Sequence, residues 1–111
     1  MEILTSQSCE PCRLGAPTVT EEEMAVLMPQ VSGWAVIEDE GVKKLMRKYE
    51  FGNFIEVLAF TNKVGDIAEQ NGHHPVMLIE YDTVTVWWWT HKIDGLHEND
   101  FIMAAKSNEC F

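Results

Sequence analysis

The stretch NFIEVLAFTNKVGDIAEQNGHHP, residues 53–75, sets the architecture that we expect for this chain. Asn53 with Glu56 three positions later has the form of a helix N-terminal cap, and Gly72 suits the left-handed backbone that closes a helix. Apolar or small residues recur between them with helical spacing, namely Phe54, Val57, Leu58, Thr61, Val64, Gly65 and Ala68. The stretch predicts a long central helix that ends at a pair of histidines.

Strand and helix signals flank this helix on both sides. Residues 34–37 and 42–51 are strand-like and are separated by a turn, as are residues 77–81 and 83–89. A Thr20-x-x-Glu23 capping box predicts a helix over residues 21–28, and the last helix is expected at 98–106. The order α-β-β-α-β-β-α predicts an α+β fold, a four-stranded antiparallel sheet with three helices packed on one face.

The length of 111 residues fits one domain. Pro11, Gly15 and Pro17 interrupt the first segment, which shows no sustained apolar period. We therefore expect residues 1–19 to form an irregular arm, lying on the domain or trailing from it, and residues 20–111 to form the single folded unit.

Charge and apolar patterning exclude several classes of function. The formal net charge of -10 repels the phosphate backbone, so direct nucleic-acid binding is disfavoured. No apolar run is long enough to span a bilayer, and the N-terminal segment lacks the features of a secretory signal. We expect a soluble cytoplasmic protein with no membrane association. Cys9 and Cys12 form a Cys-x-x-Cys pair without a second pair at zinc-finger spacing, which favours reduced thiols.

Three histidines carry the candidate chemistry. His73 and His74 precede Pro75, and His91 ends a run of β-formers and tryptophans. Imidazole exchanges protons near neutral pH and also binds metals, so proton transfer and metal binding both remain open. Pro75 favours extended backbone at His74, so the adjacent rings should project differently and do different jobs. Strand alternation places His91 on one face with Trp87 and Trp89, either as pocket lining or as an oligomer surface.

The ordered motifs resemble a known family. Glu69-x-x-x-His73-His74-Pro75 is followed by a strand ending in Thr90-His91 and then by Gly95-Leu96-x-x-x-Asp100. Together with Trp34 and the caps of the long helix, this pattern resembles pterin-4a-carbinolamine dehydratase. The resemblance covers nearly all of the chain except the N-terminal arm.

The resemblance implies dehydration of 4a-hydroxytetrahydropterin to quinonoid dihydropterin, without metal or organic cofactor. The family's catalytic histidines fall on His73, His74 and His91, and its pterin-site positions fall on Glu69, Trp34 and Asp100. It further implies a pterin substrate, a homodimer or a homotetramer built from dimers, and a functional link to an aromatic amino acid hydroxylase.

Four of the polar and aromatic positions also have purely structural interpretations. Glu69 could orient an imidazole or belong to a solvated helix face, and Trp34 could wall the pterin or belong to the core. Asp100 could serve the site or act as an acid in the first turn of the last helix, the interpretation that its position favours. His97 matches no catalytic position and is expected to cap that helix.

Two other functions compete with the dehydratase. A zinc site would use His73, His74 and His91 with Asp94 or His97, but adjacent histidines rarely converge on one ion. A non-catalytic dimerisation or regulatory binding module of the same fold is the second alternative. The presence of all three histidines argues against a module without catalysis.

Overall fold

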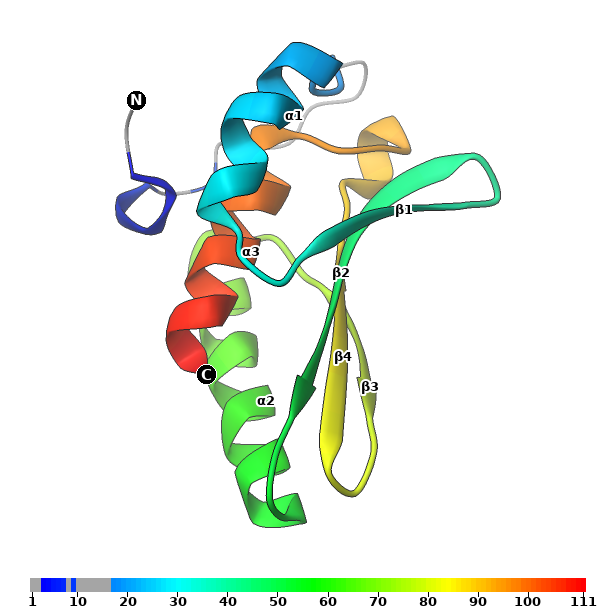
Figure 1. Ribbon diagram of the computed structural model, residues 1–111. Coiled ribbons are helices and arrows are strands. Elements are labelled where there is room, and N and C mark those ends of the chain that lie inside the picture. Colours follow the sequence, from blue (N-terminus) through cyan, green and yellow to red (C-terminus); the bar gives the residue numbers. More distant parts are fainter. Residues whose placement is uncertain (1–2, 8, 10–16) are drawn as a thin grey trace.

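Four antiparallel strands form one sheet in the order β1-β2-β4-β3 (Figure 1). The first hairpin joins β1 (Ala35–Asp39) to β2 (Val42–Glu50), and the second joins β3 (Val76–Ile79) to β4 (Thr83–Trp88). Antiparallel pairing of β2 with β4 connects the hairpins. This computed structural model, which describes residues 3–7, 9 and 17–111, confirms the predicted α+β fold.

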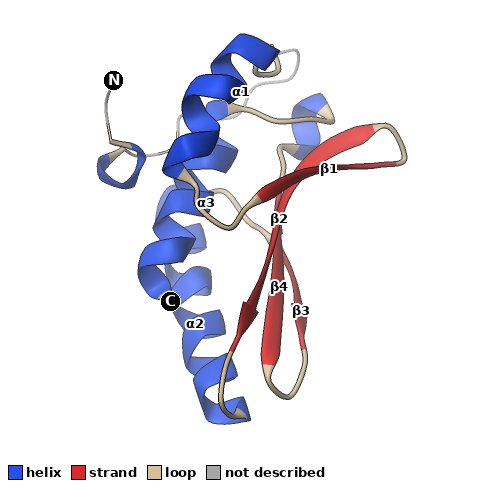
Figure 2. Ribbon diagram, viewed as in Figure 1, coloured by secondary structure: helices blue, strands red, loops and turns tan. Residues whose placement is uncertain are grey.

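The α-helices lie on one side of the sheet (Figure 2). The α-helices are α1 (Glu21–Leu27), α2 (Phe54–Asn71) and α3 (Glu98–Cys110). Short 3-10 helices are η1 (Leu4–Ser6), η2 (Met28–Gln30) and η3 (His91–Ile93). Within the described ranges, none of the helices is both long enough and apolar enough to cross a membrane.

The predicted caps fix both ends of α2. The Asn53 side chain accepts a hydrogen bond from the backbone N–H of Glu56 at 2.9 Å. Gly72 follows the helix with φ of 62°, in the left-handed region that a glycine adopts without steric cost. Because this turn ends the helix at Asn71, His73 and His74 lie in the connection to β3, as the sequence predicts.

The buried stripe of α2 differs from the face that the sequence suggests. Phe60 packs into the core, whereas Phe54 and Leu58 are exposed. Spacing alone did not distinguish these positions, because the apolar face of α2 is wider than the part of the helix that the sheet and α3 cover. The buried residues of α2 are Val57, Phe60, Val64 and Ala68.

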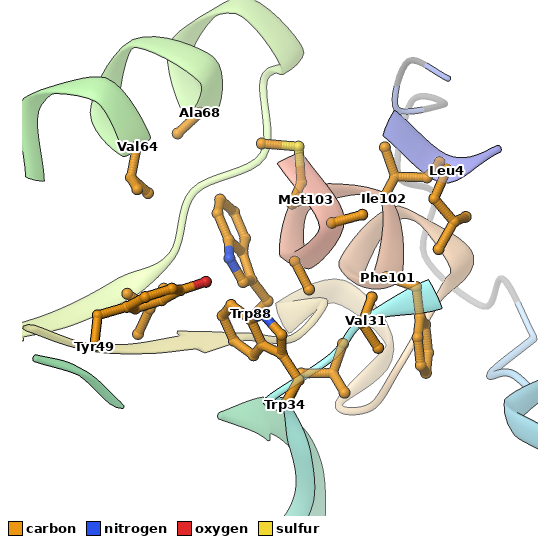
Figure 3. Close-up of a cluster of buried hydrophobic side chains, with 14 of the residues drawn as sticks. Leu4, Val31, Trp34, Tyr49, Val64, Ala68, Trp88, Phe101, Ile102 and Met103 are labelled. Atoms are coloured by element: carbon orange, nitrogen blue, oxygen red, sulfur yellow. The ribbon is translucent and has the colours of Figure 1, made fainter. Parts of the chain in front are cut away.

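Trp88 lies at the centre of the core. Figure 3 shows its indole between α2, represented by Val64 and Ala68, and Met103 of α3. The indole is fully buried, and its Nε1–H donates to the Ser107 hydroxyl at 3.1 Å. This hydrogen bond satisfies the single polar atom of the side chain, so a tryptophan can fill the space between sheet and helices.

Asn108 of α3 binds three side chains. Its Oδ1 accepts from Trp34 Nε1 at 3.0 Å, Arg47 Nη1 at 2.7 Å and the Tyr49 hydroxyl at 2.5 Å. Burial raises the pKa of Tyr49, which keeps the phenol protonated as a donor. These contacts lie beyond residue 106, where the helix was expected to end; α3 instead continues to Cys110.

The described part of the N-terminal arm lies on the domain. Leu4 is buried in the core, its N–H donates to the Gln30 side chain, and Lys106 of α3 donates to the Thr5 carbonyl. The domain boundary near residue 20 stays a prediction, and Cys12 lies outside the described residues.

Asn108→Ala is expected to lower the free energy of unfolding by about 1–3 kcal/mol, because it leaves three donors without their shared acceptor. Urea denaturation followed by circular dichroism measures the change. Asn62→Ala, at an exposed position of α2, serves as the matched control and should change stability little. Equal effects of the two substitutions would contradict this role of Asn108.

Candidate active site

His73 forms a buried pair with Asp100. The His73 ring Nε2 lies 2.6 Å from Asp100 Oδ1, and the exposed fractions of the two side chains are 7% and 0%. An ionised carboxylate only accepts hydrogen bonds, so in this pairing Nε2 carries the hydrogen. The Gly72 turn positions the ring, and the His73 backbone N–H donates to the Ala68 carbonyl at 3.2 Å.

Asp100 joins three segments of the chain. Besides His73, its carboxylate accepts from the Thr90 hydroxyl at 2.8 Å and from the backbone N–H of His97 at 2.9 Å. His97 is the N-cap of α3, as predicted, and its Nδ1 accepts from the Asn99 N–H. Asp100 therefore holds the start of α3 and a candidate catalytic imidazole with the same carboxylate.

Trp88 fixes the plane of the His73 ring. The two rings are stacked at 5.6 Å between centroids, with 15° between their planes. Trp88 is itself held in the core, so the stack adds a rigid wall to the polar contact with Asp100. Trp88 thereby fixes the plane of the imidazole, and Asp100 fixes the direction in which its Nε2 points.

His74 has the opposite environment. Its Nε2 lies 2.5 Å from Glu69 Oε1, and the exposed fractions of the side chains are 59% and 80%. The histidine that pairs with Glu69 is thus His74, five positions later and past the end of α2. The adjacent rings do diverge, one toward the buried start of α3 and the other toward solvent.

His91 is exposed at the start of η3, just after Thr90. Its ring contacts Trp89 at 4.3 Å between centroids, with 44° between the planes. Unlike the other two histidines, His91 has no carboxylate partner among the residues that the structure describes. The Thr90 hydroxyl nevertheless ties the backbone next to it to Asp100.

The candidate residues separate into three groups. His73, Asp100 and the backbone at His91 are joined through Thr90, whereas His74 and Glu69 form their own pair on the surface. Trp34 is buried in the core, where its indole N–H donates to Asn108 and its ring lies edge-on to Tyr49. Its predicted place in a pterin site stays a prediction.

Two hollows on the described surface lie away from the three histidines, and a smaller one of about 200 Å³ is lined by Asp94 and Gly95, close after His91 in the chain. One hollow, of about 510 Å³, is lined by the ends of β2, α2 and α3, including Phe51, Phe60 and Phe111. A second, of about 440 Å³, lies between η1 and α1. None of the three histidines lines either of these two hollows, and His74 and His91 are exposed.

The described residues include no group of three or more His, Cys, Asp or Glu side chains placed to hold a metal ion. The zinc alternative with Asp94 or His97 therefore gains no support from the geometry. The Cys110 thiol, another potential ligand, has its pKa raised by burial.

Known proteins resemble this chain in sequence and in fold. The family model described as pterin 4 alpha carbinolamine dehydratase matches residues 17–110. A protein of Nitrosococcus oceani named as a candidate pterin-4-alpha-carbinolamine dehydratase is 56% identical over 98% of this chain and 96% of its own length. The crystal structure of a transcriptional coactivator/pterin dehydratase from Brucella melitensis is 30% identical, with a TM-score of 0.76 over 85% of this chain and 98% of that one.

A more distant structure shares the fold alone. It is a pterin dehydratase-like protein described as a RuBisCO assembly factor in the alpha-carboxysome, 18% identical with a TM-score of 0.62. The alignment covers 73% of this chain and 92% of that chain.

An α+β domain whose histidines are paired with carboxylates has the groups of an acid–base site. The comparisons make the assignment specific: this chain belongs to the pterin-4a-carbinolamine dehydratase family. The family places it among the hydro-lyases that act on pterins.

Thr90 and Trp88 are the site residues whose roles sequence reasoning missed. Thr90 was part of the motif with His91, but its hydroxyl contact with Asp100 joins residues ten positions apart. Strand alternation puts Trp88 on the face opposite to Trp87 and Trp89, but nothing in the sequence indicates that the connection after α2 brings His73 onto its ring.

The two His–carboxylate pairs should differ in their contribution to stability. Asp100→Asn removes a buried charged acceptor and should lower the free energy of unfolding by about 1–3 kcal/mol. Glu69→Gln changes an exposed pair and should have an effect below about 1 kcal/mol. Thermal and urea denaturation of both variants measure the difference, and equal destabilisation would contradict the assigned burial.

Proposed function

We propose that this protein dehydrates 4a-hydroxytetrahydropterin, the 4a-carbinolamine, to quinonoid dihydropterin and water by histidine acid–base catalysis. The observation that carries the proposal is the buried His73–Asp100 pair directly beside the exposed His74–Glu69 pair. One imidazole is rigidly held and the next is open to substrate and solvent. Family membership supplies the pterin as the substrate class.

The reaction requires one acid and one base. The C4a–O bond breaks as the departing hydroxyl takes up a proton and leaves as water. The N5–H bond gives its proton to a base, and the electron pair forms the C4a=N5 double bond. Elimination of water neither oxidises nor reduces the pterin. Proton transfer between the substrate and imidazole groups is therefore enough to carry out the reaction.

The surroundings of the histidines suggest a division of roles. A carboxylate orients an imidazole and stabilises the imidazolium, so His73 with Asp100 suits the proton donor to the leaving hydroxyl. His91, which lacks a carboxylate partner among the described residues, suits the base at N5. His74 with Glu69 would exchange protons with solvent or hydrogen-bond the pterin.

The substrate implies a supplier. A 4a-hydroxytetrahydropterin arises when an oxygenase leaves a hydroxyl on C4a of a reduced pterin. We propose an aromatic amino acid hydroxylase as that supplier, on the strength of the family resemblance, and pterin recycling as the setting.

His73→Ala and His91→Ala are each expected to lower kcat for dehydration by about 10²–10⁴-fold, the usual contribution of a positioned acid or base. His74→Ala should have a smaller effect, because solvent can replace an exposed proton carrier. Stopped-flow absorbance of freshly made 4a-hydroxytetrahydropterin measures the rates, with Asn62→Ala as the control. Unchanged rates in all three variants would refute the mechanism, and an inactive wild type would favour the binding module.

We also propose a homodimer formed through the β3 edge of the sheet. β3 is one of the two edge strands, and Val76, Leu78 and Ile79 on it are 44%, 50% and 41% exposed. The opposite edge, β1, carries Glu38 and Asp39, which discourage strand addition. A second copy pairing along β3 would continue the sheet and cover this apolar edge.

A stripe on α2 offers a second surface for copies of the chain. Phe54, Ile55 and Leu58 are 47%, 79% and 42% exposed on consecutive turns. Large exposed apolar side chains that adjoin one another mark interaction sites more often than isolated ones do. Packing of two dimers through this stripe would form the homotetramer.

Leu78→Lys is expected to prevent association through β3, because a charge would lie within the apolar contact. Multi-angle light scattering should show wild type above the 12.7 kDa of one chain and the variant shifted toward it. Ala35→Lys, on the exposed opposite edge strand, should leave the assembly unchanged. A wild-type monomer, or equal effects of both substitutions, would contradict the proposed interface.

A further inference from the structure

Lys44 of β2 lies over the ring of Trp89. Its Nζ is 4.1 Å from the centroid of that ring, within the range of a cation–π contact. The same Nζ lies 3.0 Å from Asp39 Oδ2, and the Lys44 side chain is only 15% exposed. A lysine held by two partners and largely covered is unlike the solvated lysines of an ordinary sheet surface.

Trp89 contacts the candidate base on the same open face of the sheet. Its ring is 4.3 Å from that of His91. Asp39, Lys44, Trp89 and His91 therefore form a continuous line of side-chain contacts from the end of β1 to the start of η3. The line draws on three segments of the chain, namely β1, β2 and the stretch from Trp89 to His91.

His91 has a particular need for such support. Asp100 and Trp88 hold His73, and Glu69 meets His74, but the Trp89 ring is the recorded side-chain partner of His91. An exposed imidazole on a single 3-10 turn samples several rotamers unless a neighbour restricts it. The contact with the Trp89 ring is the restriction on the His91 ring that the structure shows.

We infer that Lys44 is a positioning residue for His91 and acts through Trp89. The ammonium group favours one orientation of the indole, and the indole in turn restricts the His91 ring. The importance of this line for catalysis rests on the dehydratase reaction proposed above. The structural part of the inference, that Lys44 fixes the orientation of the Trp89 and His91 rings, does not depend on that reaction.

Proton NMR of His91 tests the structural part independently of activity. The Trp89 ring current shifts the His91 ring protons, so Lys44→Met should move these signals toward those of a solvated histidine. Lys44→Arg retains a cation over the ring and should restore the wild-type signals. Lys48→Met, at an exposed position on the same strand and face, is the matched control and should leave them unchanged.

Unchanged His91 signals in Lys44→Met would overturn the inference, as would an equal change in Lys48→Met. Assignment of the signals by loss in His91→Gln keeps the readout specific to this ring. These NMR results test the positioning role of Lys44 even if the wild type lacks dehydratase activity. A failure of the positioning inference can therefore be distinguished from a failure of the proposed function.

A double-mutant cycle on the dehydration rate tests the functional part. Lys44→Met should lower kcat about two- to fivefold with KM little changed, the size expected when a weak cation–π contact that acts only through a second ring is lost. In a Trp89→Leu background the same substitution should have no further effect, because the intermediary ring is gone. Lys44→Arg should recover most of kcat, and fully additive losses in the cycle would overturn the relay through Trp89.

Discussion

One buried carboxylate, that of Asp100, constrains much of this molecule. A fully buried charge is tolerated only when donors surround it, and here an imidazole, a hydroxyl and a backbone N–H do so. The donors come from the connection after α2, from Thr90 at the start of η3, two residues after β4, and from the cap of α3. The ends of three elements must therefore meet at one point, and the candidate acid–base site lies where they meet.

Burial then separates two histidines that are neighbours in sequence. Both His73 and His74 have a carboxylate partner, but one pair is enclosed against Trp88 and the other faces solvent. The enclosed pair resists reorientation, whereas the exposed pair is free to exchange protons with water. A single backbone turn at Gly72 thus generates two different chemical environments from a repeated residue.

Local signals allowed the fold to be predicted from sequence, and long-range contacts limited the rest. The Asn53 cap, the Gly72 turn and the Thr20 capping box depend on residues a few positions apart, and the structure contains all three. The burial of Phe60 in place of Phe54 and Leu58 depends on which side of α2 the sheet covers, which no local pattern records. The predicted end of the last helix at residue 106 was too early, because Ser107 and Asn108 bond to side chains of the sheet and α3 continues to Cys110. Motif resemblance indicated the histidines and Asp100, whereas the link through Thr90 required the folded chain.

The double duty of Asp100 also bears on how such a chain can change over evolutionary time. Substitution at Asp100 removes an N-terminal contact of α3 together with a partner of His73, so drift at this position is opposed by selection for folding alone. His74, Glu69 and His91 are exposed and make no comparable contribution to the fold. In a descendant that lost catalysis and retained the fold, we expect substitutions at these exposed positions first. The buried aspartate would be retained, because the fold still requires it.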